Sequence, residues 1–249
     1  MVQIWNRHSG WQPISLPANA NPKNTEKTMS NKKGFIFDLD GVIVDTAKYH
    51  YLAWKKLASK LGFEFTLEQN ELFKGVSRKR CLEILLDIGG IKWSHEQFEA
   101  WMTAKNEDYL AQIEEMDESE ILPDVQRVLQ HLKAKEMPIA LGSASKNAIP
   151  ILKKVKLLDF FDVVVDGNQV SKAKPDPEVF LIAAKKMGLT ANDCVVFEDA
   201  VAGLQAANKA GMISIGIGDA KVLFDAQYVF SNFTEMDNSF LNSLLIPQE

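Results

Sequence analysis

The sequence predicts an α/β fold, in which a doubly wound parallel sheet forms a core domain and a purely helical segment forms an inserted cap domain. The first observation is that apolar runs of strand length recur along the chain, and most are separated by segments with helical periodicity. Strands that alternate with helices indicate a parallel sheet covered on both faces. The second observation is that only helical patterns occur between Thr46 and about Ile121. This interruption predicts a separate domain inserted after the first core strand.

The core is expected to contain six strands and at least four helices, each predicted by its own apolar pattern. The strand-length runs are Phe35–Phe37, Ile139–Leu141, Val163–Val165, Val195–Phe197, Ile213–Ile217 and Tyr228–Phe230. The helical patterns are Val125–Leu132, Ala148–Val155, Val179–Met187 and Ala200–Ala210.

The cap is expected to be a helical domain over residues 47–118, which divides the core into residues 32–46 and 119–249. Its helical patterns are Tyr49–Leu61, Lys79–Leu86 and Phe98–Met116. Glycine residues, which weaken helices, interrupt these patterns at Gly75, Gly89 and Gly90.

Residues 1–31 are predicted to be a disordered N-terminal extension. They are rich in Asn, Pro, Ser and Lys and show neither helical nor strand periodicity. Trp5 and Trp11 are the contrary signal, because large aromatic side chains are suited to packing on the folded body or on a partner. Met29 leaves open a second candidate start of translation.

Composition narrows the class of protein. The chain has 249 residues, of which 46% are hydrophobic and 24% are charged, as is usual for a soluble globular protein. Its net charge of −5 disfavours a general nucleic-acid binder. No apolar run approaches the roughly 20 residues needed to span a bilayer, and no signal peptide is recognisable. We therefore expect no membrane partner and a small-molecule ligand.

Cysteine usage indicates the compartment. Cys81 and Cys194 are far apart in sequence and belong to no CxxC or Cys/His cluster, so neither a disulfide framework nor a zinc site is expected. This usage fits a reducing cytoplasm, which is the expected location. A monomer is the expectation for the assembly, although the sequence itself is silent on oligomeric state.

Polar side chains follow each of the first four core strands at its carboxyl end, which is where ligands bind in an open α/β sheet. In strand order these residues are Asp38 and Asp40, then Ser143, then Lys174 in "SKAKPDPE", then Glu198 and Asp199. Four converging carboxylates would repel one another unless a divalent cation neutralised them, and hard oxygen ligands suit Mg²⁺. The pattern therefore predicts a metal and phosphate site.

Each of these residues also has a purely structural explanation. The DxD pair is compatible with a turn, Ser143 with a helix cap and Lys174 with a solvated surface charge. The pair Glu198 and Asp199 is compatible with the acidic first turn of a helix, which the helix dipole favours. The functional interpretation is preferred because all of them occur together and each lies at a strand end.

Four motifs, "DLDGVIVDT", "GSASKN", "AKPDPEVF" and "FEDAVAGLQAANKAGM", resemble those of the haloacid dehalogenase superfamily of phosphotransferases, and the resemblance runs from about Lys33 to the C-terminus. It implies a Rossmann-like core with a cap. The cap motifs "TAKYHYLAW", "KGVSRKR" and "AKNEDYL" are similar to those of the phosphosugar mutase branch, whose members interconvert β-D-glucose 1-phosphate and glucose 6-phosphate through a bound 1,6-bisphosphate.

The resemblance implies a role for each residue at the strand ends. Asp38 would be the nucleophile that forms an aspartyl phosphate, and Asp40 would be the general acid and base. Ser143 and Lys174 would stabilise the phosphoryl oxygens. The implied ligands of Mg²⁺ are Asp38, the backbone carbonyl of Asp40, Glu198 and Asp199.

A mutase also needs a second phosphate site, because its β-D-glucose 1,6-bisphosphate intermediate carries a phosphate at each end. Arg78 is the expected cap donor, with Ser145, Lys146 and Asn147 at a helix start. The alternative is that Lys146 is solvated and Asn147 merely caps the helix.

The remaining expected substrate contacts come largely from the cap. Thr46, His50 and Trp54 are spaced by four and share one helix face. His50 and Lys105 are expected around Asp40 and the sugar hydroxyls, while Trp54 is as compatible with cap core as with a sugar wall. The other expected contacts are Gly75, Val76, Ser77 and Ala144.

Two alternatives stay open from the sequence. A sugar-phosphate phosphatase would use the same core motifs, since water in place of a sugar hydrolyses the aspartyl phosphate. A phospho-aspartate signalling module is a second alternative, against which the helical cap argues. Ala200, which follows the acidic pair where small hydroxyl residues are common in the family, puts only local packing and substrate tuning in doubt.

Overall fold

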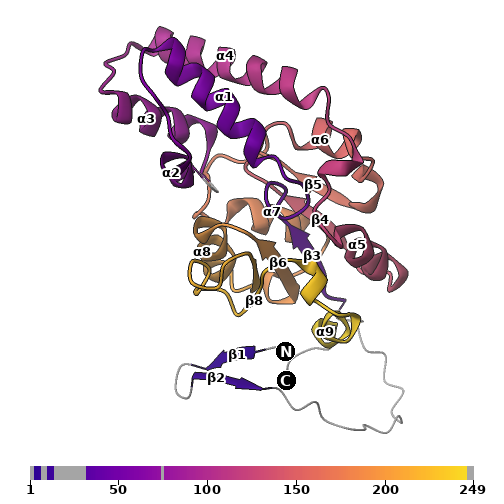
Figure 1. Cartoon of the computed structure of the whole chain (residues 1–249). Coiled ribbons are helices and arrows are strands. Elements are labelled where there is room, and N and C mark those ends of the chain that lie inside the picture. The colour runs from indigo at the N-terminus through magenta and orange to yellow at the C-terminus, as the bar shows by residue number, and fades with distance from the viewer. Residues whose placement is uncertain (1–2, 7–9, 14–31, 74–75, 246–249) are drawn as a thin grey trace, which may run out of the picture.

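The computed structural model describes residues 3–6, 10–13, 32–73 and 76–245. These residues form an α/β core, an all-helical cap beyond one end of the core sheet, and a two-stranded sheet near the N-terminus that lies beside β8 (Tyr228–Phe230) (Figure 1). The predicted fold class is therefore confirmed.

The core sheet has six parallel strands in the order β5-β4-β3-β6-β7-β8. Each predicted strand run is confirmed to within a residue or so. The strands are β3 (Gly34–Phe37), β4 (Ile139–Gly142), β5 (Val163–Val165), β6 (Cys194–Glu198), β7 (Ile213–Ile217) and β8 (Tyr228–Phe230). The chain runs outward from β3 to β5 and then returns to β6 on the other side of β3. The order therefore reverses between β3 and β6, which is where an open α/β sheet binds ligands.

Helices cover both faces of the sheet, so the central strands are apolar throughout. Phe35 and Phe37 face one apolar cluster, to which α5, α6 and α9 contribute, while Ile36 faces a second cluster with α7 and α8. The core helices are α5 (Val125–Ala134), α6 (Ala148–Lys154), α7 (Glu178–Lys186), α8 (Val201–Lys209) and α9 (Asn238–Leu244). Short 3-10 turns occur at Glu118–Glu120, Leu158–Phe160, Ala191–Asp193 and Phe233–Glu235.

The cap contains α1 (Ala47–Lys60), α2 (Leu67–Asn70), α3 (Arg78–Gly89) and α4 (His95–Ile113), with a 3-10 turn at Glu71–Phe73. A capping box begins α4, in which the Ser94 hydroxyl accepts from the Gln97 amide and the Gln97 side chain accepts from the Ser94 amide. Gly90, with φ of 61°, ends α3 in the left-handed conformation. The cap helices bury a cluster of their own, which includes Trp54, Leu82 and Phe98. The cap therefore has its own hydrophobic core.

The chain enters and leaves the cap at neighbouring points. The Asp45 amide donates to the Glu120 carbonyl at 2.9 Å, and the Leu122 amide donates to the Ile43 carbonyl at 3.0 Å. The Tyr49 hydroxyl and the Lys48 amine also reach the Glu120 carboxylate, at 2.6 and 2.7 Å. The two linkers thus form a short paired hinge between the domains.

The N-terminal segment differs from the expectation. Two strands, β1 (Gln3–Asn6) and β2 (Gly10–Pro13), pair antiparallel with Trp5 opposite Trp11, whereas the sequence showed no strand periodicity here. Each strand has four residues, which is too short for an alternating pattern to be recognised, although tryptophan favours strands. The expectation of disorder is corrected for these strands. The rest of residues 1–31 lies outside the described part of the chain.

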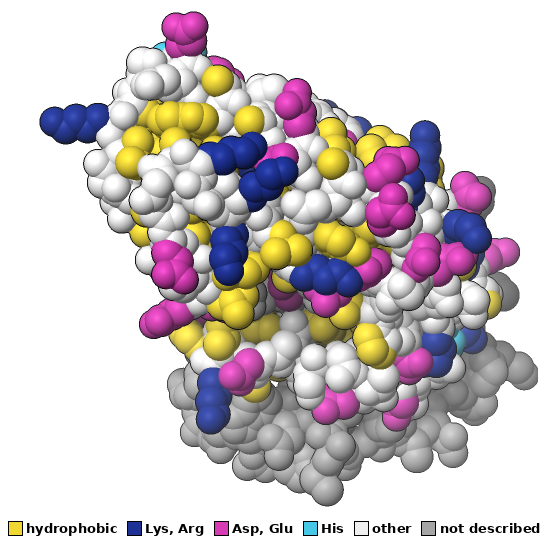
Figure 2. Space-filling view, turned by 45° about the horizontal axis from the view of Figure 1, so that its top comes forward, with side chains coloured by type: hydrophobic (Ala, Val, Ile, Leu, Met, Phe, Trp, Pro, Cys, Tyr) yellow, Lys and Arg dark blue, Asp and Glu magenta, His cyan; other side chains and the backbone are white. Residues whose placement is uncertain are grey.

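The surface and the cysteines agree with an ordinary globular protein. On the face in Figure 2, Lys and Arg side chains are interspersed with Asp and Glu, so this face carries no extended field of one sign. Cys81 and Cys194 are both buried and free. Among the described residues, no helix has the length and apolar character needed to cross a membrane.

Candidate active site

A tight loop after β3 positions the two aspartates of the DxD motif. The Asp38 amide donates to the Phe197 carbonyl of β6 at 3.0 Å, and the Gly41 amide donates to the Val44 carbonyl at 2.9 Å. Gly41 has φ of 79°, and a Cβ there would lie 2.1 Å from Asp199 Oδ2. The turn therefore requires glycine both for its backbone conformation and for the close approach of Asp199.

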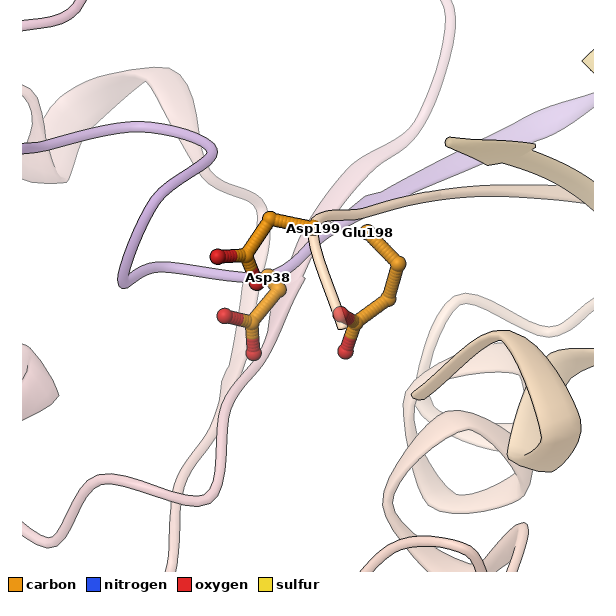
Figure 3. A group of neighbouring side chains, drawn as sticks. All are labelled: Asp38, Glu198 and Asp199. Atoms are coloured by element: carbon orange, nitrogen blue, oxygen red, sulfur yellow. The ribbon is translucent and has the colours of Figure 1, made fainter. Parts of the chain in front are cut away.

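Three carboxylates meet where the sheet order reverses. Asp38 follows β3, Glu198 ends β6 and Asp199 follows it, and each offers an oxygen within 4.8 Å of the others. Figure 3 shows the three side chains gathered around one small region. Asp38 and Glu198 are buried, while Asp199 is half-buried. The prediction that these acids converge is confirmed.

Lys174 joins two of these acids. Its Nζ lies 2.6 Å from Asp38 Oδ1 and also donates to Glu198 Oε1, and it lies 4.8 Å from the centre of the Phe180 ring. Burial works against the charge of Lys174, but Asp38 and Glu198 outweigh it and raise the pKa of the amine. Lys174 therefore stays protonated and is held as a fixed positive charge.

One lysine does not neutralise three acids. Burial, the largest cause, raises the pKa of Glu198 to about 7, and burial with the charges of Glu198 and Asp38 raises the pKa of Asp199 well above its usual value. These shifts mean that the cluster lacks positive charge. A set of carboxylate oxygens in this state fits a hard divalent cation such as Mg²⁺.

The carboxylate of Asp40 lies apart from this cluster. Its Oδ1 accepts a hydrogen bond from the Thr46 hydroxyl and lies 3.8 Å from His50 Nε2. Burial, followed by the charge of Asp38, raises the pKa of Asp40 to about 6. Asp40 therefore lies close enough to Asp38 and Asp199 for their charges to interact, but it is not one of the three acids whose oxygens lie within 4.8 Å of one another. Thr46 is fully buried, and its hydroxyl donates to Asp40.

A chain of hydrogen bonds shapes the loop after β4. The Ser143 hydroxyl is buried and accepts from the Ser145 amide at 3.0 Å, and the Ser145 hydroxyl accepts from the Asn147 amide at 3.2 Å. Ala144 and Ser145 are half-buried, whereas Lys146 is exposed. Asn147 is buried and makes no side-chain cap to α6, so the alternative that it merely caps the helix is wrong.

The cap contributes three basic side chains on the side of the site near Asp40, those of His50, Arg78 and Lys105, which we call the basic cap group. Lys105 is 1% exposed, and its Nζ lies 3.1 Å from His50 Nδ1 and within 5 Å of the ring centres of Trp54 and Tyr109. The His50 ring stacks on Tyr109 at 4.3 Å. Burial, with the charge of Arg78, lowers the pKa of Lys105 to about 7, and burial with Lys105 lowers the pKa of His50 well below its usual value. The basic side of the site therefore favours a negatively charged ligand.

Arg78 is the first residue of α3 and is half-buried, and burial lowers the pKa of its guanidinium. Ser77 precedes it as the N-cap, with its hydroxyl accepting from the Arg80 amide at 3.3 Å. Val76 and Ser77 are half-buried, while Gly75 lies outside the described residues. Arg78 acts electrostatically on both His50 and Lys105, which places it in the same group.

Trp54 was expected to contact substrate or to pack in the cap. It is 2% exposed and its ring meets Phe73 edge-on at 5.5 Å. Trp54 is therefore part of the cap core. The expectation that it forms a wall of the sugar pocket is corrected, because no open face of its ring remains for a sugar.

Two residues near the site were not predicted. Asn106 accepts a hydrogen bond from the Asn147 side chain at 3.0 Å, and Tyr109 is fully buried with its hydroxyl unpaired among the described residues. Tyr109 follows Lys105 by four on α4, so helical spacing would have placed it on the same face. Asn106 belongs to the cap motif "AKNEDYL", but its position on the helix does not indicate that it reaches the core.

A cavity of about 950 Å³ opens beside the acidic cluster. Gly41 and Asp199 form part of its wall, and Glu71 lines it from the cap. Its volume is in the range that accommodates small molecules. The basic cap residues do not line it, so it gives access to the acidic side of the site.

The comparison with family models defines the class of protein. The model described as haloacid dehalogenase-like hydrolase matches residues 32–211. The chain therefore belongs to the haloacid dehalogenase-like hydrolases, an enzyme family, as its motifs predict.

The relatives narrow the comparison further. The chain is 38% identical over 212 residues to the β-phosphoglucomutase of Bacillus subtilis, a match covering 84% of this chain and 94% of the relative. The crystal structure of β-phosphoglucomutase from Clostridium difficile superposes with a TM-score of 0.82 at 38% identity, covering 86% of this chain and 97% of that one. A phosphorylated carbohydrates phosphatase of Thermotoga maritima is 31% identical, over 77% of this chain and 89% of the relative.

Proposed function

We propose that this protein is a β-phosphoglucomutase, which interconverts β-D-glucose 1-phosphate and glucose 6-phosphate through an aspartyl phosphate and a bound 1,6-bisphosphate. The observation that carries the proposal is that an acidic cluster with a lysine on the core and a basic group on the cap flank the same aspartate, Asp40. A mutase needs one site for the phosphoryl group in transfer and one for the other phosphate. The similarity to two β-phosphoglucomutases at 38% identity supports the same conclusion.

Asp38 is the proposed nucleophile. One of its oxygens is held by Lys174, which leaves the other oxygen to attack phosphorus in line as the bond to the sugar oxygen breaks. Lys174 and Ser143 would then donate to the phosphoryl oxygens as charge builds on them. The buried hydroxyl of Ser143 is already fixed by its bond to the Ser145 amide.

Asp40 is the proposed general acid and base. A pKa of about 6 suits a carboxyl group that must give a proton to the leaving sugar oxygen and take one from the attacking hydroxyl near neutral pH. Thr46 fixes its orientation through the bond to Oδ1, and His50 lies on the same oxygen.

Asp38, Glu198, Asp199 and the backbone carbonyl of Asp40 are the proposed ligands of Mg²⁺. The ion would supply the positive charge that the three carboxylates lack and would shield the nucleophile from the negative phosphate. Glu198 is oriented for this by the Ala200 amide, which donates to its Oε2 at 3.0 Å.

The sugar and the second phosphate are proposed to bind between the cap and the loop after β4. Arg78 would form paired hydrogen bonds to that phosphate, and His50 and Lys105 would face the sugar hydroxyls. The other proposed contacts are Gly75, Val76, Ser77, Ala144, Ser145, Lys146 and Asn147.

A sugar-phosphate phosphatase is the second candidate. It is favoured by the relatives at 31% and 30% identity, a phosphorylated carbohydrates phosphatase of Thermotoga maritima and a fructose-1-phosphate phosphatase of Escherichia coli. The same aspartyl phosphate serves both reactions, and the acceptor, water or sugar, decides the product.

Phosphorus NMR separates the two candidates. With Mg²⁺, β-glucose 1-phosphate and a trace of the 1,6-bisphosphate, we expect glucose 6-phosphate to accumulate much faster than inorganic phosphate. Inorganic phosphate as the main product would replace the mutase with the phosphatase. Phosphorylation without turnover of any small phosphate would instead favour a signalling module.

A further inference from the structure

The cap and the core are tied together along α4 and α6. At the start of α6, Asn147 Nδ2 donates to Asn106 Oδ1 of α4 at 3.0 Å. At the end of α6, Lys154 Nζ donates to the Glu114 carbonyl at 2.7 Å and lies 2.9 Å from the Glu114 carboxylate. These two ties hold the cap helix to both ends of one core helix.

The two ties differ in burial and therefore in energetic weight. The Glu114 side chain is 72% exposed and that of Lys154 is 35% exposed, and exposed ion pairs contribute little. Asn147 is buried and Asn106 is half-buried. A buried amide that loses its partner bears a real desolvation cost, so the asparagine pair is the tie that fixes local geometry.

The asparagine pair also continues the hydrogen-bonded loop after β4. Ser143 holds the Ser145 amide, and Ser145 holds the Asn147 amide. The side chain of Asn147 then reaches Asn106, so one path of hydrogen bonds runs from the end of β4 to the cap. An asparagine amide has two N–H donors, and Asn106 occupies only one of those of Asn147. The contact fixes the plane of the Asn147 amide and leaves its second donor for another acceptor.

We propose that Asn106 is a positioning residue for the phosphate that is not being transferred. It orients the Asn147 amide so that the second N–H donates to that phosphate, and it makes this orientation depend on the cap being seated against α6. The proposal rests on the mutase function, since that reaction requires a second phosphate in every half-reaction. Asn106 itself does not touch the substrate.

The test compares Asn106→Ala, Asn147→Ala and the double variant in the mutase assay. Loss of the oriented hydrogen bond should raise the KM for β-glucose 1-phosphate about five- to tenfold in Asn106→Ala, with kcat within about twofold of the wild type. Because Asn106 acts only through Asn147, the double variant should resemble Asn147→Ala. Effects that multiply in the double variant, or an unchanged KM in Asn106→Ala, would overturn the proposal.

Two controls separate positioning from a general structural role. Lys154→Ala removes the other tie between the same helices and should leave KM unchanged; an increase equal to that of Asn106→Ala would count against the asparagine pair. Phosphoenzyme formation from acetyl phosphate, which has no second phosphate, should proceed in Asn106→Ala at the wild-type rate. A matching loss in that reaction would show that the variant disturbs the nucleophile and would overturn the proposal.

A binding measurement distinguishes failure of the mutase function from failure of the role proposed for Asn106. If the wild type forms no glucose 6-phosphate, the variants are compared by calorimetric titration with glucose 1,6-bisphosphate without Mg²⁺. Asn106→Ala should then weaken binding by the same five- to tenfold factor, about the worth of one hydrogen bond. A wild type that does not bind the bisphosphate would overturn both the function and the role of Asn106.

Discussion

The core and the cap bury ionisable groups of opposite sign on two sides of Asp40. On the core side, Asp38, Glu198 and Asp199 share a single lysine, Lys174. On the cap side, neither Lys105 nor Arg78 forms an ion pair among the described residues. Burial has moved the pKa values on both sides toward neutrality, with Glu198 and Lys105 each at about 7. Each side is therefore incomplete without a ligand of the opposite charge, a cation on the core and an anion on the cap.

This difference indicates how the two ligands of the proposed function, a metal ion and a phosphorylated sugar, would bind to separate parts of the site without mutual interference. The acids are held by strand ends and a tight glycine turn, which are rigid elements. The bases are carried by cap helices, which connect to the core through a short hinge. Substitutions on the core should therefore remove chemistry, while substitutions on the cap should chiefly weaken binding.

The largest effect is expected from Asp38→Asn. An amide cannot form the acyl phosphate, so both phosphoenzyme and turnover should fall by at least about a thousandfold. Trapping of labelled phosphoenzyme and the mutase assay measure this, with Asp45→Asn, an exposed residue of the same loop, as the control. Appreciable turnover in a folded Asp38→Asn protein would remove Asp38 from the nucleophile role.

Asp40→Asn should come next, slowing turnover about a hundred- to ten-thousandfold with little change in Mg²⁺ affinity, because its side chain lies outside the acidic cluster. In the proposed mechanism, attack of β-glucose 1-phosphate on the phosphoenzyme needs Asp40 ionised. Its rate should therefore decline as pH falls through about 6. That decline should disappear in the variant. A collapse of Mg²⁺ binding instead would make the Asp40 side chain a metal ligand.

Arg78→Ala probes the cap side and should act on binding. Loss of a charged hydrogen bond costs roughly 1.5–3 kcal/mol, or about ten- to a hundredfold in the affinity for the second phosphate. The bisphosphate should escape more often before it rebinds in the reverse orientation, which phosphorus NMR detects as free intermediate. Arg80→Ala, on the same helix but paired with Glu83, is the matched control. Equal behaviour of the two variants would argue against a phosphate contact at Arg78.

Lys105→Met should weaken substrate binding about tenfold but stabilise the fold below neutrality. Burial lowers the pKa of Lys105 from 10.5 to about 7, so between these values the unfolded chain binds more protons than the folded protein. Wild-type stability therefore rises with pH across this window. The variant should exceed the wild type by about 1–3 kcal/mol at pH 6 in urea unfolding, with the excess shrinking by pH 10. A difference independent of pH would show that Lys105 is not the group responsible. Lys79→Met, at an exposed position, controls for the loss of a surface charge.

Deletion of residues 1–31 should have the smallest effect. The family model begins to match at residue 32, and the described residues of the extension, 3–6 and 10–13, belong neither to the acidic cluster nor to the basic cap group. Turnover and melting temperature should stay nearly unchanged, within about 2 °C for the latter, as for changes away from the core. A large loss of either would mean that this segment packs on the folded body.

The sequence predicted the core site well because strand ends are strong signals. Asp38, Ser143, Lys174 and Glu198 each follow a clear apolar run, and parallel strands bring their carboxyl ends to one edge. The sequence did not indicate that the Asp40 side chain accepts a hydrogen bond from Thr46, because a spacing of six residues across a loop does not show which side chains meet. The cap was harder. A helical pattern shows which residues share a face but not what that face meets.

Asn106 and Trp54 illustrate that limit. Both lie on correctly predicted cap helices. Trp54 points into the cap core and Asn106 reaches Asn147 of the core, and both facts depend on the packing of one helix against another. The N-terminal strands were missed for a different reason, because four residues are too few to show alternation.

The pairing of the two linkers, in which Asp45 bonds to Glu120 and Leu122 bonds to Ile43, has an evolutionary consequence. Because the ends of the cap already meet, removing or exchanging the cap changes the closure of a surface loop and leaves the register of the sheet intact. A gene encoding such a core can acquire, lose or trade caps while its catalytic strands stay the same. Under the proposed function, substrate range and phosphoryl transfer would then be free to change separately, the first through the cap and the second through the core.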